Sequence, residues 1–244
     1  KMKSLYRIPI DGGESVRVLG TPTSMGSFDI SDDGNHVAFL AKEEQDDAIQ
    51  DLEDEGFNQE IYEEDWLPTR VWVAALEGDS GRDAKQPKPR MLDLNGSAIS
   101  VLWNPDGDEL MVVLAPTPSV DDSYMQKRVF VVNAESGKVI RSLNNPGKLG
   151  QVSWSPDGEH LAIVSAVDIH DPEEGRLMVT SVHKESGLVD LIPGLKAHVH
   201  TISWKDNSTL YWLAAEGITS RFGIVNLEGD VTDLLAPGGD GDPV

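Results

Sequence analysis

One short phrase of sequence occurs four times along the chain, and this repeat constrains the fold more than any other feature. In each copy an apolar segment arrives, a polar turn follows, and a second apolar segment leaves. In the turn Pro105-Asp106-Gly107, proline presets φ, aspartate hydrogen-bonds back to the backbone and glycine accepts a positive φ. Each copy therefore predicts a tight β-hairpin. The copies are residues 28–39, 101–112, 152–163 and 202–212.

The spacing of the copies is nearly constant. Ile30, Trp103, Trp154 and Trp204 hold the same place in the phrase, and the last two intervals are 51 and 50 residues long. The first interval is 73 residues, and removing an acidic insertion of roughly 25 residues brings it close to the repeat period of kelch- and WD-type blades. The chain is therefore expected to be built from equivalent units in series.

A second hairpin follows each copy. Residues 128–143 turn at Glu135-Ser136-Gly137, and the corresponding hairpins span 71–94, 177–192 and 222–235. The unit is thus four antiparallel strands, which predicts an all-β fold, a β-propeller of four-stranded antiparallel blades. A β-sandwich with chance similarity between hairpins is the alternative, and the regular spacing favours the propeller.

The two ends of the chain do not supply a full blade. Residues 4–20 hold a single hairpin that matches the second half of a blade, and no strand follows residue 235. We therefore expect about four and a half blades in an incomplete fragment of a larger propeller, with sheet faces at both ends that invite association. The predicted organisation is one propeller domain over 1–244, with a half blade at 4–20, blades at 21–96, 97–146, 147–197 and 198–237, and an acidic insertion at 43–67.

The charge of the chain restricts its partners. The formal net charge is −22, and residues 43–65 contribute twelve carboxylates with no Lys or Arg. Nucleic acid and anionic membranes are poor partners, because both require a basic face. Cysteine is absent, which excludes disulfides and thiolate chemistry.

The blades resemble the N-terminal propeller of prolyl oligopeptidase-family serine peptidases, especially the bacterial acylaminoacyl-peptidase and dipeptidyl-aminopeptidase-like branch. The resemblance covers nearly the whole chain, and the Pro-Asp-Gly turn alone is also found in TolB-like propellers. It is carried by 28–39, by the insertion ending at 63–73, by 114–124, and by 154–158 with 165–175.

The resemblance implies a propeller of the seven-bladed type that restricts which peptides reach a Ser-Asp-His triad in a C-terminal α/β-hydrolase domain. The chain has no Gly-x-Ser-x-Gly nucleophile elbow, so the family's catalytic residues match no position here. We expect no activity from the chain alone, no cofactor, and as partners its own hydrolase domain and peptide substrates. No apolar core of a signal peptide is visible, and a cytoplasmic location is expected, with the periplasm as the alternative.

Glu63 and Glu64 are the candidate substrate-binding residues. Paired glutamates hold the free N-terminal amine of the peptide in dipeptidyl-peptidase relatives, and a carboxylate in the insertion is suited to the same charge-assisted hydrogen bond. The alternative is a solvated acidic loop. A short helix is expected within 45–54, because its Ala, Leu, Gln and charged residues permit one.

Three other patterns have a structural interpretation that we prefer. His198 and His200 would face the same side of a strand, but no third ligand of a metal site is evident, so no metal is expected. The repeated tryptophans are interpreted as packing between blades, and the alternative is a stacking platform for sugars or peptides. The Asp-rich stretches 32–34 and 168–171 lack the ligand pattern of a calcium loop and are interpreted as turns.

Three functions remain at this point. The first is the substrate-gating propeller of a serine peptidase that cleaves short peptides. The second is a non-enzymatic propeller of TolB or WD type that acts as a protein-interaction scaffold. The third, a glycan-acting enzyme, needs paired carboxylates near the propeller axis, whereas the carboxylates here cluster in the insertion and in turns.

Overall fold

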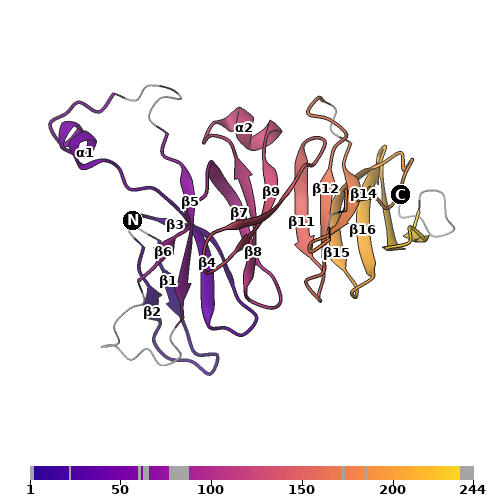
Figure 1. Ribbon diagram of the computed structural model, residues 1–244, viewed down its shortest axis with the longest axis horizontal. Helices are drawn as coiled ribbons and strands as arrows, with labels where there is room; N and C mark the ends of the chain where they lie inside the picture. The colour runs from indigo at the N-terminus through magenta and orange to yellow at the C-terminus, as the bar shows by residue number, and fades with distance from the viewer. Residues whose placement is uncertain are drawn as a thin grey trace. The chain divides into compact units, whose positions relative to one another are not determined.

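The fold is taken from a computed structural model, which describes residues 3–21, 23–59, 62, 66–76, 88–171, 174–184 and 186–236. Within these residues the chain is all-β, with one two-stranded sheet and four four-stranded sheets of consecutive antiparallel strands (Figure 1). Such sheets are the blades of a β-propeller, so the predicted fold class is confirmed. No helix in the described part of the chain is long and apolar enough to cross a membrane.

The strands follow the chain without crossovers. The two-stranded sheet is β1 (Leu5–Arg7) and β2 (Val16–Leu19), and the first blade is β3 (Met25–Ile30), β4 (His36–Lys42), β5 (Thr69–Ala75) and β6 (Arg90–Met91). The second blade is β7 (Ser97–Trp103), β8 (Glu109–Ala115), β9 (Arg128–Asn133) and β10 (Val139–Leu143). The third is β11 (Leu149–Trp154), β12 (His160–Ser165), β13 (Arg176–Ser181) and β14 (Val189–Asp190), and the fourth is β15 (His198–Trp204), β16 (Thr209–Glu216), β17 (Thr219–Asn226) and β18 (Val231–Leu235).

Two short helices interrupt the strands. Helix α1 (Asp47–Asp54) lies between β4 and β5, inside the range where a helix was expected. Its N-cap is Asp46, whose side chain accepts a hydrogen bond from the Ala48 amide and so satisfies one of the free donors of the first turn. Helix α2 (Val120–Met125) lies between β8 and β9 and was not predicted. It is short and buries no residue, so its sequence carries no amphipathic pattern to find.

The chain forms two compact units, which are described separately. The first comprises Lys1–Ser123 and Phe130–Ile140, and the second comprises Tyr124–Val129 and Arg141–Val244. The first unit holds β1 to β8 with most of β9, and the second holds β11 to β18. Nothing in this division tests the predicted blade boundaries or the prediction that the chain is a fragment of a larger propeller.

Each unit has its own core. In the first unit β8 is buried along its whole length, and its Leu110 and Val112 belong to a core cluster shared by the first two blades. A second cluster of this unit surrounds Phe39 and Leu19, between the two-stranded sheet and the first blade. In the second unit the largest fully buried side chain is Trp212, which packs with apolar residues of β12 to β17.

The repeated phrase forms the predicted tight turn in each blade. In the first, Ser31 Oγ donates to Asp33 Oδ1 at 2.6 Å, and the amide of Gly34 donates to the Ser31 carbonyl at 2.7 Å. The third blade repeats both bonds with Ser155, Asp157 and Gly158. The glycines have φ of 72° and 71°, a left-handed conformation that side chains with a Cβ rarely adopt. We call this end of each blade the turn end.

Candidate functional site

The blades differ at the end opposite to their repeated turns, which we call the loop end. Because the strands are antiparallel, the connections from the second to the third strand of each blade lie there. These connections are residues 43–68, 116–127, 166–175 and 217–218. The first holds α1 and the whole acidic insertion, and Figure 1 shows α1 away from the strands that it connects. This insertion is the candidate functional site.

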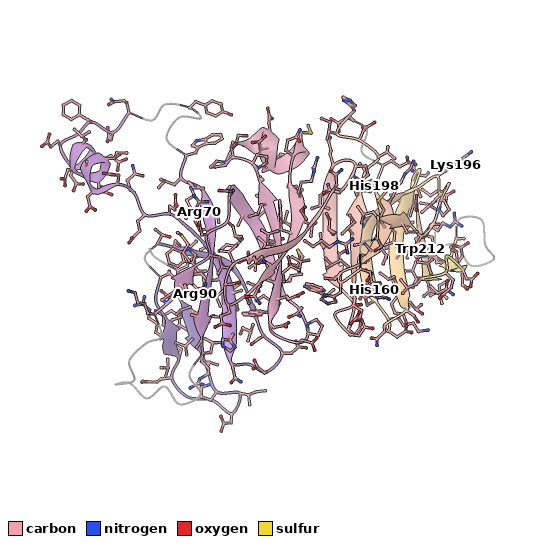
Figure 2. The ribbon with its side chains drawn as sticks, viewed as in Figure 1. Arg70, Arg90, His160, Lys196, His198 and Trp212 are labelled. Atoms are coloured by element: carbon pink, nitrogen blue, oxygen red, sulfur yellow. The ribbon has the colours of Figure 1, made fainter. Side chains whose placement is uncertain are left out.

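Arg70 on β5 anchors the base of the insertion. Its Nε atom donates to Glu43 Oε1 at 2.9 Å, and its Nη1 atom donates to the carbonyls of Leu94 and Gly96, both at 2.9 Å. The Glu43 amide also donates to the Pro68 carbonyl at 3.0 Å, so the two ends of the insertion meet. Figure 2 labels Arg70 at this position. Sequence reasoning missed Arg70, although it is the first cation after residue 42 and opens the next strand.

The described part of the insertion beyond this base is exposed. Helix α1 buries none of its residues. Farther along, Tyr62 and Trp66 form an edge-to-face aromatic contact, with ring centroids 5.4 Å apart and an interplanar angle of 83°. Glu63 and Glu64, the predicted substrate-binding residues, lie between these two rings in the sequence but outside the described residues, so their role stays a prediction.

His198 and His200 each contact a residue of a neighbouring loop or of their own strand. His198 Nδ1 accepts a hydrogen bond from the Gly175 amide at 2.9 Å, and His200 Nδ1 lies 3.0 Å from the Thr201 hydroxyl. Figure 2 labels His198 on the last blade. Among the described residues no group of three His, Asp or Glu side chains is placed to hold a metal ion.

The repeated tryptophans pack between blades, as predicted. In the first unit Trp103 Nε1 donates to the Asp29 carbonyl at 3.2 Å, and its ring contacts His36 of the preceding blade. In the second unit Trp204 Nε1 donates to the Ser153 carbonyl at 3.3 Å and its ring contacts His160. Asp29 and Ser153 hold the same place in their blades, so one contact recurs in both units. The tryptophans are therefore structural and not a platform for ligands.

The Asp-rich turns also have a structural role. Asp33 accepts hydrogen bonds from the Ser31 hydroxyl and from the amide and side chain of Asn35, and these bonds lower its pKa to about 2. The pKa of Asp157 is also lowered. Desolvation is the largest single effect and raises this pKa, but the hydrogen bonds from Ser155 and the Glu159 amide together outweigh it. In the other predicted stretch, 168–171, Asp168 Oδ1 accepts a hydrogen bond from the His170 amide at 2.8 Å, so both stretches carry turn-type hydrogen bonds, as interpreted.

A cavity of about 640 Å³ lies at the turn end of the first unit and was not foreseen. Arg90 of β6 reaches across it, and its Nη2 atom donates to the Ala134 carbonyl of the next blade at 2.8 Å. Figure 2 labels Arg90 and Arg70 on neighbouring strands of one sheet. The charged and polar lining is mixed in sign and comes from strand ends and turns of two blades, namely His36, Lys88, Arg90, Asp108, Asn133 and Glu135.

Comparison with known proteins identifies relatives by structure alone. No family model matches the sequence, and no curated protein sequence matches it. A putative TolB from Agrobacterium tumefaciens is similar with a TM-score of 0.58 and 14% identity, over 94% of this chain and 73% of that one. A puromycin-hydrolyzing peptidase of Mycobacterium tuberculosis is similar with a TM-score of 0.57 and 18% identity, over 91% of this chain. The tricorn protease has a TM-score of 0.58 and 12% identity, over 87% of this chain.

These similarities confirm the resemblance at the level of the fold. The chain spans 30% of the mycobacterial peptidase and 19% of the tricorn protease. It thus has the propeller fold that peptidases and TolB proteins share, and it matches a part of those peptidases.

Proposed function

We propose that the chain is the substrate-gating propeller of a serine peptidase that cleaves short peptides, with the hydrolase domain outside these 244 residues. The observation that supports this function most directly is the acidic insertion, which is tied at its base by Arg70 and exposed beyond it. A blade that carries a long exposed connection has a means of contacting a peptide before it reaches another domain.

The proposed selection is by size and charge. A peptide with a free N-terminal amine brings a positive charge, and the insertion offers carboxylates and contains no Lys or Arg of its own. Glu63 and Glu64 are proposed to accept hydrogen bonds from that amine, with Tyr62 and Trp66 flanking them in the sequence. We propose a cytoplasmic location for the parent protein.

The first experiment is to sequence the encoding gene downstream of Val244. A hydrolase domain with a Gly-x-Ser-x-Gly elbow is the expected result. A stop codon, or a second interaction module, would reject the peptidase function. Esterase and aminopeptidase assays of the 244-residue chain are expected to be blank, and hydrolysis that persists after repurification would also contradict the proposal.

The second experiment uses the protein that the gene encodes. We expect it to cleave short peptides faster than long ones, and free peptides faster than their N-acetylated forms. The double variant Glu63→Gln/Glu64→Gln should raise KM for the free peptide and leave KM for the acetylated peptide unchanged. Glu135→Gln/Glu228→Gln, which neutralises two exposed carboxylates at turn ends, is the matched control.

A non-enzymatic scaffold of TolB or WD type is the second candidate. The chain covers 73% of the Agrobacterium TolB, but 30% of the mycobacterial peptidase and 19% of the tricorn protease. This difference in coverage favours the scaffold. A scaffold would be encoded without a hydrolase domain, and its loop-end residues would bind a folded partner instead of short peptides.

A further inference from the structure

Helix α1 carries an apolar stripe that no part of the described structure covers. Ile49 and Leu52 are 46% and 50% exposed, and Phe57, just after the helix, is 59% exposed. Residues three or four apart share one face of a helix, so Ala48, Ile49 and Leu52 lie together on one side. Large apolar side chains grouped on a protruding element indicate a docking surface.

The rest of the helix surface is acidic and uncompensated. The nearest carboxylate that has a cation is Glu43, at the base, which Arg70 holds. None of the carboxylates from Glu44 to Glu55 forms an ion pair with another described residue. The helix therefore presents an apolar stripe bordered by negative charge on both sides.

This charge decides between possible occupants. A second copy of the chain carries a net charge of −22 and would meet like charge, as would an anionic membrane or a nucleic acid. A segment with apolar side chains beside Lys or Arg is complementary to this surface. Its apolar groups would pack on the stripe and leave water, and its cations would approach the carboxylates on either side.

We propose that α1 binds cationic amphipathic peptide segments, with Ile49 and Leu52 as the apolar contacts and with Asp51, Glu53 and Glu55, which lie three or four residues from members of the stripe, as the charged ones. This inference rests on the proposed function and deepens it, because it names the class of peptide that the gate admits. Binding is measured on the 244-residue chain, without a hydrolase domain. A failure here therefore leaves the peptidase proposal standing, and the reverse also holds.

The test uses fluorescently labelled synthetic peptides of about twelve residues and measures anisotropy. One peptide combines Lys and Leu at helical spacing, the second replaces Lys by Glu, and the third replaces Leu by Ser. We expect the Lys/Leu peptide to bind at least about tenfold more tightly than either of the others, with affinity that falls as salt is raised.

Two variants separate the contributions, and a third serves as the control. Ile49→Ala/Leu52→Ala keeps helix propensity and should weaken Lys/Leu binding by about tenfold. Asp51→Asn/Glu53→Gln/Glu55→Gln should weaken it by a similar factor and reduce the salt dependence. The control, Asp121→Asn/Glu135→Gln/Glu228→Gln, removes the same formal charge elsewhere on the exposed surface and should bind like the parent chain.

Three results would overturn the proposal. The first is unchanged binding in Ile49→Ala/Leu52→Ala. The second is an equal loss in the control triple variant, which would show that only net charge matters. The third is a chain that elutes as a dimer which the alanine variant dissociates, because a second copy would then be the occupant.

Discussion

The turn end and the loop end of the blades follow opposite rules. At the turn end side-chain hydrogen bonds close the repeated turn of every blade, and the first and third blades share the same one, in the Ser31–Asp33 and Ser155–Asp157 pairs. At the loop end no two connections have the same length, from residues 43–68 in the first blade to 217–218 in the last.

This difference separates what folds the chain from what distinguishes it. The repeated turn fixes the register between the first and second strands of a blade, so that their apolar residues reach the core. The variable connections carry little buried surface, as the wholly exposed α1 shows. Substitutions at buried repeat positions should therefore cost stability, and substitutions at the loop end should alter binding.

The largest expected effect is at Trp212, the largest fully buried side chain. Trp212→Ala should lower the free energy of unfolding by about 3–5 kcal/mol, because it opens a cavity and removes the ring below the Arg221 guanidinium. Denaturant unfolding measures the change. Trp66→Ala, in the insertion, is the comparison and should cost about 1 kcal/mol or less; equal losses would refute the contrast between the ends.

The second effect is at Gly223 on β17, where the backbone of one strand lies close to a buried ring. A Cβ here would lie 2.7 Å from both the Trp212 ring and the Thr232 carbonyl. Gly223→Ala should destabilise the chain by about 1–3 kcal/mol. Gly187→Ala, where a Cβ meets open space, is the control. The same unfolding experiment checks both, and a neutral Gly223→Ala would contradict the packing described.

The third effect is at the base of the insertion. Arg70→Met removes the partner of Glu43 and the donor to the Leu94 and Gly96 carbonyls, and should cost about 1–2 kcal/mol, because the pair is partly screened by solvent. It should also expose residues 43–59 to limited proteolysis. Arg70→Lys restores the charge but not the forked geometry, and should recover only part of the loss. Proteolysis at the parent rate would argue against an anchor.

A smaller effect depends on pH. The pKa of Asp33 is about 2 in the folded chain, below its ordinary value of 3.8, and the pKa values of Asp157 and Asp206 are also lowered. A lowered folded-state pKa means that the stabilisation is present above about pH 4 and is lost as the pH falls towards 2. Asp33→Asn/Asp157→Asn should flatten the decline of the urea midpoint over this range, and an unchanged slope would contradict it.

The sequence predicted the blades because their signals are local and repeated. Pro, Asp and Gly at fixed offsets define the turn, and apolar alternation defines the strands on either side, so the hairpins and the short helix α1 could be placed beforehand. The packing role of Trp103 and Trp204 followed from their period. The hairpins and α1 depend on residues close together in the chain, and the tryptophan contacts, although long-range, repeat with the period of the blades.

Features that depend on distant residues were not predictable in this way. Arg70 meets Glu43 and the 94–96 carbonyls only because β5 runs beside the base of the insertion. The cavity near Arg90 forms where strand ends and turns of two blades meet, and their approach depends on how the blades pack. The exposure of Ile49 and Leu52 could not be read from residue type, since the same stripe on a covered helix would be part of a core.

The most direct test is to replace residues 43–68 by the two-residue connection Gly217-Ile218 of the last blade. The exchange preserves register, because Lys42 pairs with Thr69 as Glu216 pairs with Thr219. If the insertion serves binding and not folding, the free energy of unfolding should stay within about 1 kcal/mol of the parent chain. Binding of the Lys/Leu peptide should fall below the level of Ile49→Ala/Leu52→Ala, because the exchange removes the charged contacts of α1 as well as the apolar ones. A chain that unfolds, or that binds the peptide as before, would contradict the account.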